Sequence, residues 1–451
     1  MAIRIFLRGL CALIVAFAAL TGRASAQDQL SFIRDAEMES IIRLYATPIF
    51  RAAGLNATDI HIYLVNDQRL NAFVAGGQNL FINTGTIMRS ESPNQLVGII
   101  AHETGHIAGG HLARSQEALR HATIESIIAM VAGAAAAVAS KSPDAAAAAI
   151  LGGQSVGERS FLQYSVGQEA AADQAGLNFL ERTGQSARGL QQFFKILEGE
   201  ELLSAARQDP YLRSHPFTRD RIRTVEERVS RSKFSDVPDP PQWIELHQRM
   251  KAKLAGFLSP PAQTLAKYKA EDTSIPARYA RAVALYRIPD LKRAVPAIDA
   301  LIQDRPNDPY FRELKGQMLF ENGRIKEAVP EYEKAVELKP DSALLRIELA
   351  QAQIESNDPA LNLKALAHLN EAVRFEDQNG DAWRFMATAQ GKAGQFGMAA
   401  LALAEEGLVN GNKKQARQQA TRALQLLPPT AGTARQRAQD IQHEADRPDK
   451  N

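Results

Sequence analysis

The chain has 451 residues, of which 45% are hydrophobic and 23% are charged. This length and composition are typical of two or three packed domains and exclude a chain that is disordered throughout. The formal net charge is +2, and taking away Arg4, Arg8 and Arg23, which lie in a predicted targeting segment, leaves −1. A near-neutral chain gives no support for nucleic-acid binding through phosphate contacts.

The first 26 residues are typical of a secretory signal peptide. Arg4 and Arg8 precede an apolar run from Gly9 to Leu20, and the small residues Ala24-Ser25-Ala26 predict cleavage after Ala26. An uncleaved anchor is the alternative, but the run is shorter than the ~20 residues that a spanning helix needs. The only cysteine, Cys11, lies in this segment, so disulfides, cysteine-ligated zinc and a cysteine nucleophile are excluded from the mature chain.

The next part of the chain predicts a small sheet between two helices. Apolar residues at helical spacing, including Phe32 and Ile33, predict an amphipathic helix from Gln27 to about Gly54. A strand is expected over 60–65. A hairpin follows, with strands at 71–74 and 79–83 joined by Gly76-Gly77. A buried helix is then expected from Asn94 to Leu112.

Two alanine-rich apolar stretches lie at 127–139 and 145–151. Each is too short to span a bilayer as a straight helix. We interpret them as packed or lid-forming helices, with contact to a membrane surface as the alternative. Further helices are expected at 157–182, 187–199 and 217–232.

The strongest chemical signal is His102-Glu103-Thr104-Gly105-His106. Two histidines at positions i and i+4 project from the same face of a helix, so both imidazoles can reach one metal ion. Glu103 lies beside them, where its carboxylate can accept a proton from water instead of binding the metal. The pattern predicts a zinc site that needs at least one more protein ligand.

Two residues are candidates for the third ligand. His111 falls about 140° around a continuous helix from His106, so we expect it to cap the helix or face solvent. Glu169 lies in a segment of small residues that permit close helix approach, and Asp173 follows one turn later. We expect Glu169 to complete the site and Asp173 to orient a ligating imidazole through its free N–H.

Small residues recur every 34 positions in the C-terminal half, at Ala282, Gly316 and Ala350. This period, with small residues where paired helices cross, is typical of tetratricopeptide repeats. Three extra residues near 357–360 interrupt the register, which resumes and ends near Pro428. We expect a repeat solenoid, with a generic helical array as the alternative, followed by a polar and frayed tail.

These motifs together resemble a known family. The HExxH motif, followed by Glu169-x-x-x-Asp173 and preceded by an Asn-Ala-Phe hairpin with Gly-Gly, resembles the gluzincins that include the CAAX prenyl protease and the bacterial heat-shock membrane protease. With a signal peptide and C-terminal repeats, the layout is similar to that of periplasmic β-barrel assembly-enhancing proteases. The resemblance implies that His102, His106 and Glu169 bind one Zn²⁺ per chain and that Glu103 is the general base.

The family also carries a His-Pro segment that ends in Arg-Ile, and residues 214–222 match it through His215 and Arg221. The resemblance implies that His215 is a regulatory fourth metal ligand that holds the enzyme latent. It implies that Arg221 positions substrate or the carboxylates around the metal. Without the family, a loop histidine before proline is typical of a surface residue.

The predicted fold class is α+β: a mostly helical zincin-like protease domain with a small β-sheet, followed by an all-α tetratricopeptide-repeat solenoid. The expected divisions are a signal peptide at 1–26, a zinc metalloprotease domain at 27–236, a proline-containing helical linker at 237–269, the solenoid at 270–428 and a polar tail at 429–451.

The expected function is a periplasmic zinc endopeptidase that degrades misfolded or misassembled proteins, with outer-membrane β-barrels as clients. An extended substrate would add to the strand formed by Asn71, Ala72, Phe73 and Val74. The repeats would recruit partners, including the outer-membrane barrel assembly machinery, and peripheral membrane contact stays open. The alternative is a periplasmic chaperone or assembly factor whose protease is mostly latent.

Overall fold

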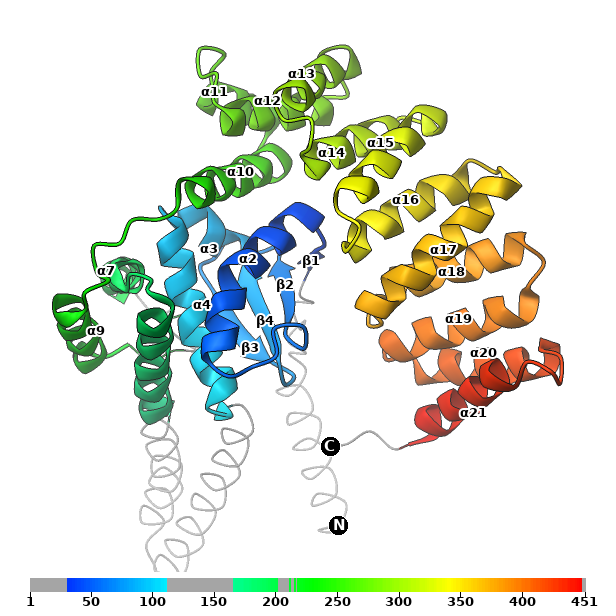
Figure 1. Ribbon diagram of the computed structural model, residues 1–451, viewed down its shortest axis with the longest axis horizontal. Helices are drawn as coiled ribbons and strands as arrows, with labels where there is room; N and C mark the ends of the chain where they lie inside the picture. The colour runs from blue at the N-terminus through cyan, green and yellow to red at the C-terminus, as the bar shows by residue number, and fades with distance from the viewer. Residues whose placement is uncertain (1–30, 112–164, 202–210, 212–214, 216, 448–451) are drawn as a thin grey trace, which may run out of the picture.

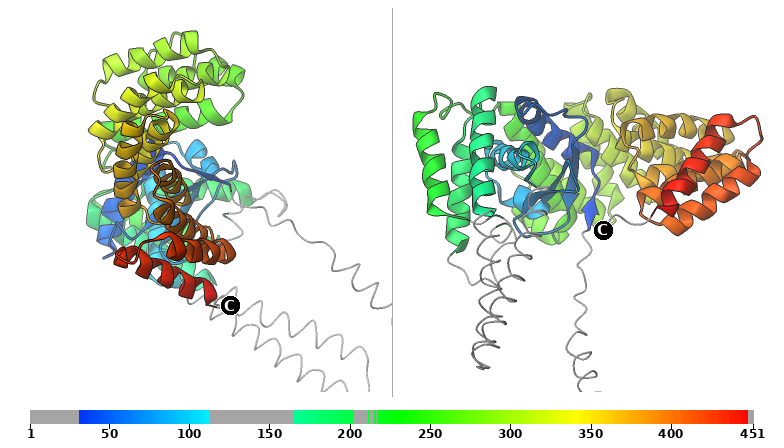
Figure 2. Two further views of the ribbon diagram at one scale, coloured as in Figure 1. Left: turned by 90° about the vertical axis from the view of Figure 1, so that its right-hand side faces the viewer. Right: turned by 90° about the horizontal axis from the view of Figure 1, so that it is seen from below.

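A small sheet with its helices, a second helical group and a curved array of helix pairs make up the structure (Figure 1). The computed structural model describes residues 31–111, 165–201, 211, 215 and 217–447. The signal-peptide prediction and the alanine-rich stretches at 127–151 lie outside the described residues. The sheet lies between its own helices on one side and the helical array on the other (Figures 1 and 2). The predicted α+β fold class is confirmed.

The first helix begins later than the sequence pattern predicts. Strand β1 (Phe32–Ile33) pairs antiparallel with strand β2 (His61–Val65), so the helical interpretation of residues 32 and 33 is wrong. Helix α2 (Ala36–Ala52) starts after Asp35, whose side chain accepts a hydrogen bond from the backbone N–H of Met38. This cap fixes the helix start and leaves the preceding residues free to pair with β2.

The predicted hairpin is confirmed as strands β3 (Ala72–Ala75) and β4 (Asn79–Asn83), which pair antiparallel. The loop between them is three residues long, and Gly76 and Gly77 both have positive φ, a backbone conformation that glycine adopts readily. The strand order is β1-β2-β4-β3, with β2 and β4 parallel, so β3 is an edge strand. One face of the sheet is apolar and buried beneath α2 and helix α4 (Pro93–Ala108). Its buried side chains include Ile62, Leu64, Leu80 and Ile82.

The helix that carries the HExxH motif ends before its predicted boundary. After the short helix α3 (Thr84–Arg89), helix α4 (Pro93–Ala108) begins at Ser92, whose side chain accepts from the N–H of Gln95. It ends at Gly109, and Gly110 has a φ of +62°. The prediction that this helix continues to Leu112 is therefore wrong, because a left-handed glycine turns the chain away.

Three further helices complete the protease side of the structure, with α7 packed on α4 and α9 packed on α7. The described part of the predicted 157–182 helix is helical over 165–183. Helices α7 (Arg188–Glu201) and α9 (Arg219–Arg231) agree with the predicted helices within two residues at each end. Their apolar side chains join those of α2, α4 and the sheet in one core.

The C-terminal half is a curved array of helix pairs, which confirms the predicted solenoid (Figure 1). Gly316 shows why the repeat needs small residues: a Cβ added there would lie 3.0 Å from the Tyr332 ring of the paired helix. The described residues contain no helix with the length and apolar character needed to cross a membrane. The helices are α10 (Pro241–Leu258), α11 (Pro261–Lys267), α12 (Ile275–Arg287), α13 (Leu291–Asp304), α14 (Pro309–Glu321), α15 (Ile325–Leu338), α16 (Ala343–Glu355), α17 (Pro359–Phe375), α18 (Gly380–Lys392), α19 (Phe396–Val409), α20 (Lys413–Leu426) and α21 (Gly432–Asp446).

The frayed tail predicted after Pro428 is wrong for most of its length. Residues 432–446 form α21, which packs on α20. Ala438 and Ile441 are fully buried there. A polar sequence with only a narrow apolar stripe is sufficient for a terminal repeat helix, because its other faces remain in water.

Helix α10 joins the two halves through a buried ionic cluster. Arg249 contacts Glu37 of α2 at 2.5 Å and Asp308 before α14 at 2.5 Å. Lys253 lies 2.7 Å from Asp35 and 3.5 Å from Glu313 of α14. Because these charges are buried and paired across the junction, they fix how the repeats sit against the protease side.

Candidate metal centre

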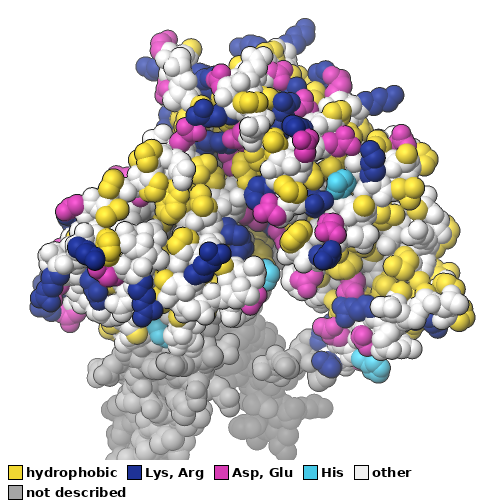
Figure 3. Space-filling view, in the orientation of Figure 1, with side chains coloured by type: hydrophobic (Ala, Val, Ile, Leu, Met, Phe, Trp, Pro, Cys, Tyr) yellow, Lys and Arg dark blue, Asp and Glu magenta, His cyan; other side chains and the backbone are white. Residues whose placement is uncertain are grey.

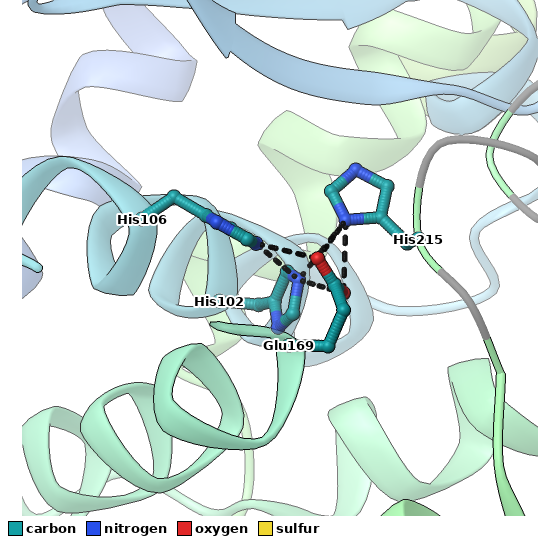
Figure 4. A group of neighbouring side chains, drawn as sticks. All are labelled: His102, His106, Glu169 and His215. Atoms are coloured by element: carbon teal, nitrogen blue, oxygen red, sulfur yellow. Dashed lines mark hydrogen bonds and ion pairs between the residues drawn. The ribbon is translucent and has the colours of Figure 1, made fainter. Parts of the chain in front are cut away.

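Helix α4 presents the HExxH side chains toward a buried point beneath β3. His102 and Glu103 are fully buried and His106 is 8% exposed. Glu169, from the helix at 165–183, and His215 point to the same place (Figure 4). One ligand atom from each of His102, His106, Glu169 and His215 lies within 4.8 Å of the others. The structure thus brings together residues from three separate segments of the sequence.

The spacing of these atoms fits a single metal ion. The Nε2 atoms of His102 and His106 are 3.1 Å apart, and the carboxylate oxygens of Glu169 lie 3.3 Å and 3.2 Å from them. His215 Nδ1 lies 3.4 Å from His102 Nε2 and 3.1 Å from Glu169 Oε2. A tetrahedral ion such as Zn²⁺, with bonds of about 2.0–2.1 Å, has ligand atoms roughly 3.3–3.4 Å apart. The donor set and its dimensions therefore suit a four-coordinate metal.

Close helix packing places Glu169 in this set. A Cβ added at Gly105 would lie 2.6 Å from the carbonyl oxygen of Ala172, so the two backbones nearly touch at that point. Gly176 makes a similar approach to Ala101 one turn away. The absence of a side chain at Gly105, inside the motif itself, is what lets the second helix bring its carboxylate to the histidines.

Asp173 and Arg221 surround the ligands with a second set of contacts. Asp173 Oδ1 lies 2.8 Å from His102 Nδ1, the nitrogen that faces away from the metal position. Arg221 donates to Asp173 through Nε at 2.6 Å, and its Nη1 lies 3.0 Å from Glu169 Oε2. Burial alone would raise the pKa of Asp173, but hydrogen bonds from His102 and Arg221 hold it below its usual value. The carboxylate stays ionised and fixes the orientation of the imidazole.

Glu103 differs from the other acids of the site. Both of its carboxylate oxygens are buried and, among the described residues, neither has a hydrogen-bond partner. His215 lies close by, with its Nε2 3.6 Å from Oε1 of Glu103. Burial raises the pKa of Glu103. A buried carboxylate without a partner, beside a metal-binding set, is suited to exchange protons with a substrate or water.

His215 faces the site with one nitrogen and the sheet with the other. Its Nδ1 points to the three other ligand atoms, and its Nε2 lies 3.3 Å from the carbonyl oxygen of Ala72 in β3. The ring of Tyr211 stacks on it, with centroids 4.3 Å apart and planes at 24°. The imidazole thus occupies both a ligand position and a hydrogen-bonding position on the predicted substrate strand.

His111 is not where the sequence pattern places it. The expectation that it caps the helix or faces solvent is wrong: it is 6% exposed, and its Nδ1 lies 3.0 Å from His106 Nδ1. The left-handed Gly110 turns the chain so that His111 folds back onto the outer nitrogen of His106. His111 and Tyr211 are the two site residues that sequence reasoning missed. The extra histidine after the HExxH motif was a usable signal, whereas nothing in the sequence singled out Tyr211.

The predicted substrate strand lies at the edge of the sheet above the site. Ala72 and Val74 turn their side chains inward and are buried, while Phe73 lies on the outer face. Asn71 precedes the strand, and its N–H donates to Thr86 Oγ1 at 2.9 Å. Among the described strands β3 pairs only with β4, so its other edge faces the metal position.

Comparison with known proteins agrees with this geometry. Residues 33–229 match the model of Peptidase family M48, and 279–343 and 313–377 match that of the tetratricopeptide repeat. The beta-barrel assembly-enhancing protease of Yersinia pestis is 23% identical over 366 residues, which cover 80% of this chain and 73% of that protein. Metalloprotease LoiP of Escherichia coli (strain K12) is 28% identical over 208 residues, covering 45% of this chain and 76% of that protein.

Among solved structures, the crystal structure of MamA aligns with 36% of this chain and 91% of its own, at 18% identity and a TM-score of 0.29. The family match covers all four residues of the metal-binding set and Glu103. The chain is therefore a metalloprotease with a peptidase domain that matches family M48, followed by tetratricopeptide repeats.

Proposed function

We propose that this metalloprotease is a zinc endopeptidase of the cell envelope that degrades misfolded or misassembled proteins, including outer-membrane β-barrel proteins. The observation that carries the proposal is the buried convergence of His102, His106 and Glu169 next to the unpartnered carboxylate of Glu103. Two imidazoles and one carboxylate are a usual ligand set of catalytic zinc. The names of the relatives, and the signal peptide expected at 1–26, support the envelope and the clients.

In the mechanism, His102, His106 and Glu169 would hold the metal. Bound zinc would polarise the scissile carbonyl and lower the pKa of water. Glu103 accepts a proton from the attacking water and later delivers it to the leaving nitrogen, which its raised pKa favours. Asp173 keeps the proton on Nδ1 of His102, so that Nε2 is free to bind the metal.

Strand β3 would align the substrate. An extended chain that adds to its free edge would place its backbone beside Glu103, and the carbonyl of Ala72 would accept one of its N–H groups. In the observed state His215 Nε2 lies on that carbonyl. Substrate and His215 would therefore compete for the strand as well as for the metal.

The ligand assignment is tested by metal content. Zinc would be measured in the full chain carrying His102→Ala, His106→Ala or Glu169→Ala, with His61→Ala on the outer sheet face as control. Each ligand variant should lose most of its zinc, and the control should keep it. Stoichiometric zinc in Glu169→Ala would contradict its assignment as the third ligand.

The proposed latch at His215 has its own test. His215→Ala should raise the cleavage of an unfolded substrate relative to wild type at equal zinc occupancy, because it opens a ligand position and frees the Ala72 carbonyl. Equal or lower activity in the variant would remove the latch and make His215 a substrate-site or structural residue.

The same contact favours a second candidate function, that of a periplasmic chaperone or assembly factor whose protease is mostly latent. The repeats would then act by recruiting partners, among them the outer-membrane barrel assembly machinery, and the chain would touch the membrane only peripherally. Complementation of a deletion strain by Glu103→Gln would favour this role. Failure to complement would favour proteolysis.

A further inference from the structure

Four aromatic side chains form a continuous stripe across the outer face of the sheet. Phe73 and Phe81 stack with centroids 4.9 Å apart, Phe81 and Tyr63 stack at 5.1 Å, and Tyr63 and Phe32 follow at 5.9 Å. Each ring comes from a different strand, in the order β3, β4, β2 and β1. We refer to these four residues as the aromatic stripe.

The stripe lies on the face that α2 and α4 do not cover. Phe32 is 47% exposed, and the other three rings are partly exposed. The opposite face already supplies the buried core. The open face of a sheet is usually polar, so four adjacent rings there indicate a surface that contacts an apolar partner.

Near its β1 end the stripe borders a cleft of about 570 Å³ between the sheet and the repeats. Tyr63 of the stripe lies in its wall, opposite Leu344 and the 53% exposed Phe375 of the repeats. Figure 3 shows the surface hollowed between the two halves of the molecule. The cleft thus connects the sheet with the solenoid, and its mostly polar wall also presents these apolar side chains.

The charged side chains that line the cleft nearly balance, because four of them are basic and three are acidic. Arg34 bonds to Glu39 and to Glu376 across the cleft. The other basic side chains of the wall also have partners: Arg43 donates to two backbone carbonyls, Lys339 pairs with Asp341, and Arg374 pairs with Glu371. Single-stranded nucleic acid also stacks on aromatic rings, but it needs cations for its phosphates. An uncharged polypeptide is the partner that this surface fits.

The other end of the stripe reaches the edge above the metal position. Phe73 is next in sequence to Ala72, whose carbonyl contacts His215. Three strand spacings of about 4.8 Å separate the outermost rings, so the stripe is roughly 14 Å long. An extended chain covers that distance in four to five residues. The stripe and the candidate active site are therefore continuous.

We propose that the aromatic stripe binds an extended, aromatic-rich segment of the substrate and selects clients by that segment, which lies about four to eight residues from the scissile bond. This inference rests on the proposed function, because β3 is taken as the strand that aligns substrate. Aromatic side chains of the substrate stack on the stripe, and the cleft receives the chain beyond it. A segment of an unfolded β-barrel protein that has aromatic residues at alternate positions presents such a row of rings on one side.

The test uses two peptides with the same scissile sequence. One carries three Phe or Tyr residues at positions four to eight from the bond, and the other carries Ser there. The full zinc-loaded chain should show about tenfold higher kcat/KM for the aromatic peptide. The ratio of the two kcat/KM values should fall close to one in Phe81→Thr and in Phe32→Ser. Because the ring of Phe32 is exposed, its replacement is not expected to disturb folding. The preference should persist in Phe396→Ser, an equally apolar but remote position that is 61% exposed.

Equal cleavage of the two peptides by the wild-type chain would overturn the inference and leave the protease intact. A preference that survives in both stripe variants would also overturn it. If neither peptide is cleaved, the proposed function fails. The inference is then tested separately by fluorescence anisotropy: the aromatic peptide should bind the full chain, and the stripe variants should bind it several-fold more weakly. Tighter binding of a single-stranded oligonucleotide than of the peptide would contradict the choice of partner.

Discussion

Gly105→Ala tests whether the approach of two helices sets the geometry of the metal centre. The added Cβ would lie 2.6 Å from the carbonyl oxygen of Ala172, whereas ordinary contact begins at 3.4 Å. The helix that carries Glu169 must therefore move away by about 0.8 Å. Metal sites keep their ligand distances within about 0.2 Å. We expect zinc affinity to fall by about 10- to 100-fold, as for the loss of an outer-shell contact, and the free energy of unfolding by about 1–3 kcal/mol.

Gly167→Ala is the matched control for this substitution. It lies in the helix that carries Glu169, and a Cβ added there has no atom within 4 Å. It should raise the free energy of unfolding by about 0.5–1 kcal/mol through helix propensity and leave zinc binding unchanged. Zinc affinity would be measured by competition with a chelator, and stability by urea unfolding of the zinc-free chain. Unchanged zinc affinity in Gly105→Ala would refute the argument that this contact positions Glu169.

Three further predictions concern buried polar groups. Asp173→Asn should weaken zinc binding by about 10- to 100-fold in a chelator competition, whereas the exposed Asp220→Asn in the neighbouring helix should not. Lys253→Met should lower the free energy of unfolding by about 3–5 kcal/mol because it leaves Asp35 and the buried Glu313 without their basic partner, and the exposed Lys334→Met should change it little. Similar midpoints in urea for both variants would contradict this. Burial lowers the pKa of His247 from 6.5 to about 4. Stability that is present above pH 6.5 should therefore be lost as the pH falls to 4, by on the order of 3 kcal/mol. In urea unfolding at a series of pH values, His247→Gln should show a weaker pH dependence than the wild-type chain, and an identical dependence would contradict the prediction.

Much of the site could be predicted because its chemistry imposes sequence spacing. The pair His102 and His106 must lie one turn apart to share a metal, and that spacing is visible in one helix. Glu169 could be predicted only because two histidines need a further ligand and its neighbours are small. His215 entered through family resemblance, since a loop histidine has no periodicity that links it to a distant helix.

The residues that sequence reasoning missed depend on tertiary turns. His111 supports His106 only because Gly110 adopts a positive φ and ends the helix early. A continuous helix would have placed His111 elsewhere. Tyr211 stacks on His215, and the backbone N–H of His215 donates to the carbonyl of Tyr211. Contacts of this kind follow from the path of the backbone, which residue spacing alone does not define.

The fold was predicted best where one pattern dominated. The 34-residue period and the Gly76-Gly77 turn each indicated a single structure, and both are present. Phe32 and Ile33 were assigned to a helix because they match helical spacing with the residues after them. Pairing with β2 and the Asp35 cap outweigh that local preference.

The central claim is that a zinc ion held by His102, His106 and Glu169 acts with Glu103 to hydrolyse peptide bonds. The most direct measurement is casein cleavage by the full chain and by Glu103→Gln, each with its zinc content determined in the same preparation. We predict one zinc ion per chain in both proteins and cleavage by the wild-type chain alone. Equal cleavage by Glu103→Gln, or wild-type cleavage that persists after zinc has been removed, would contradict the claim.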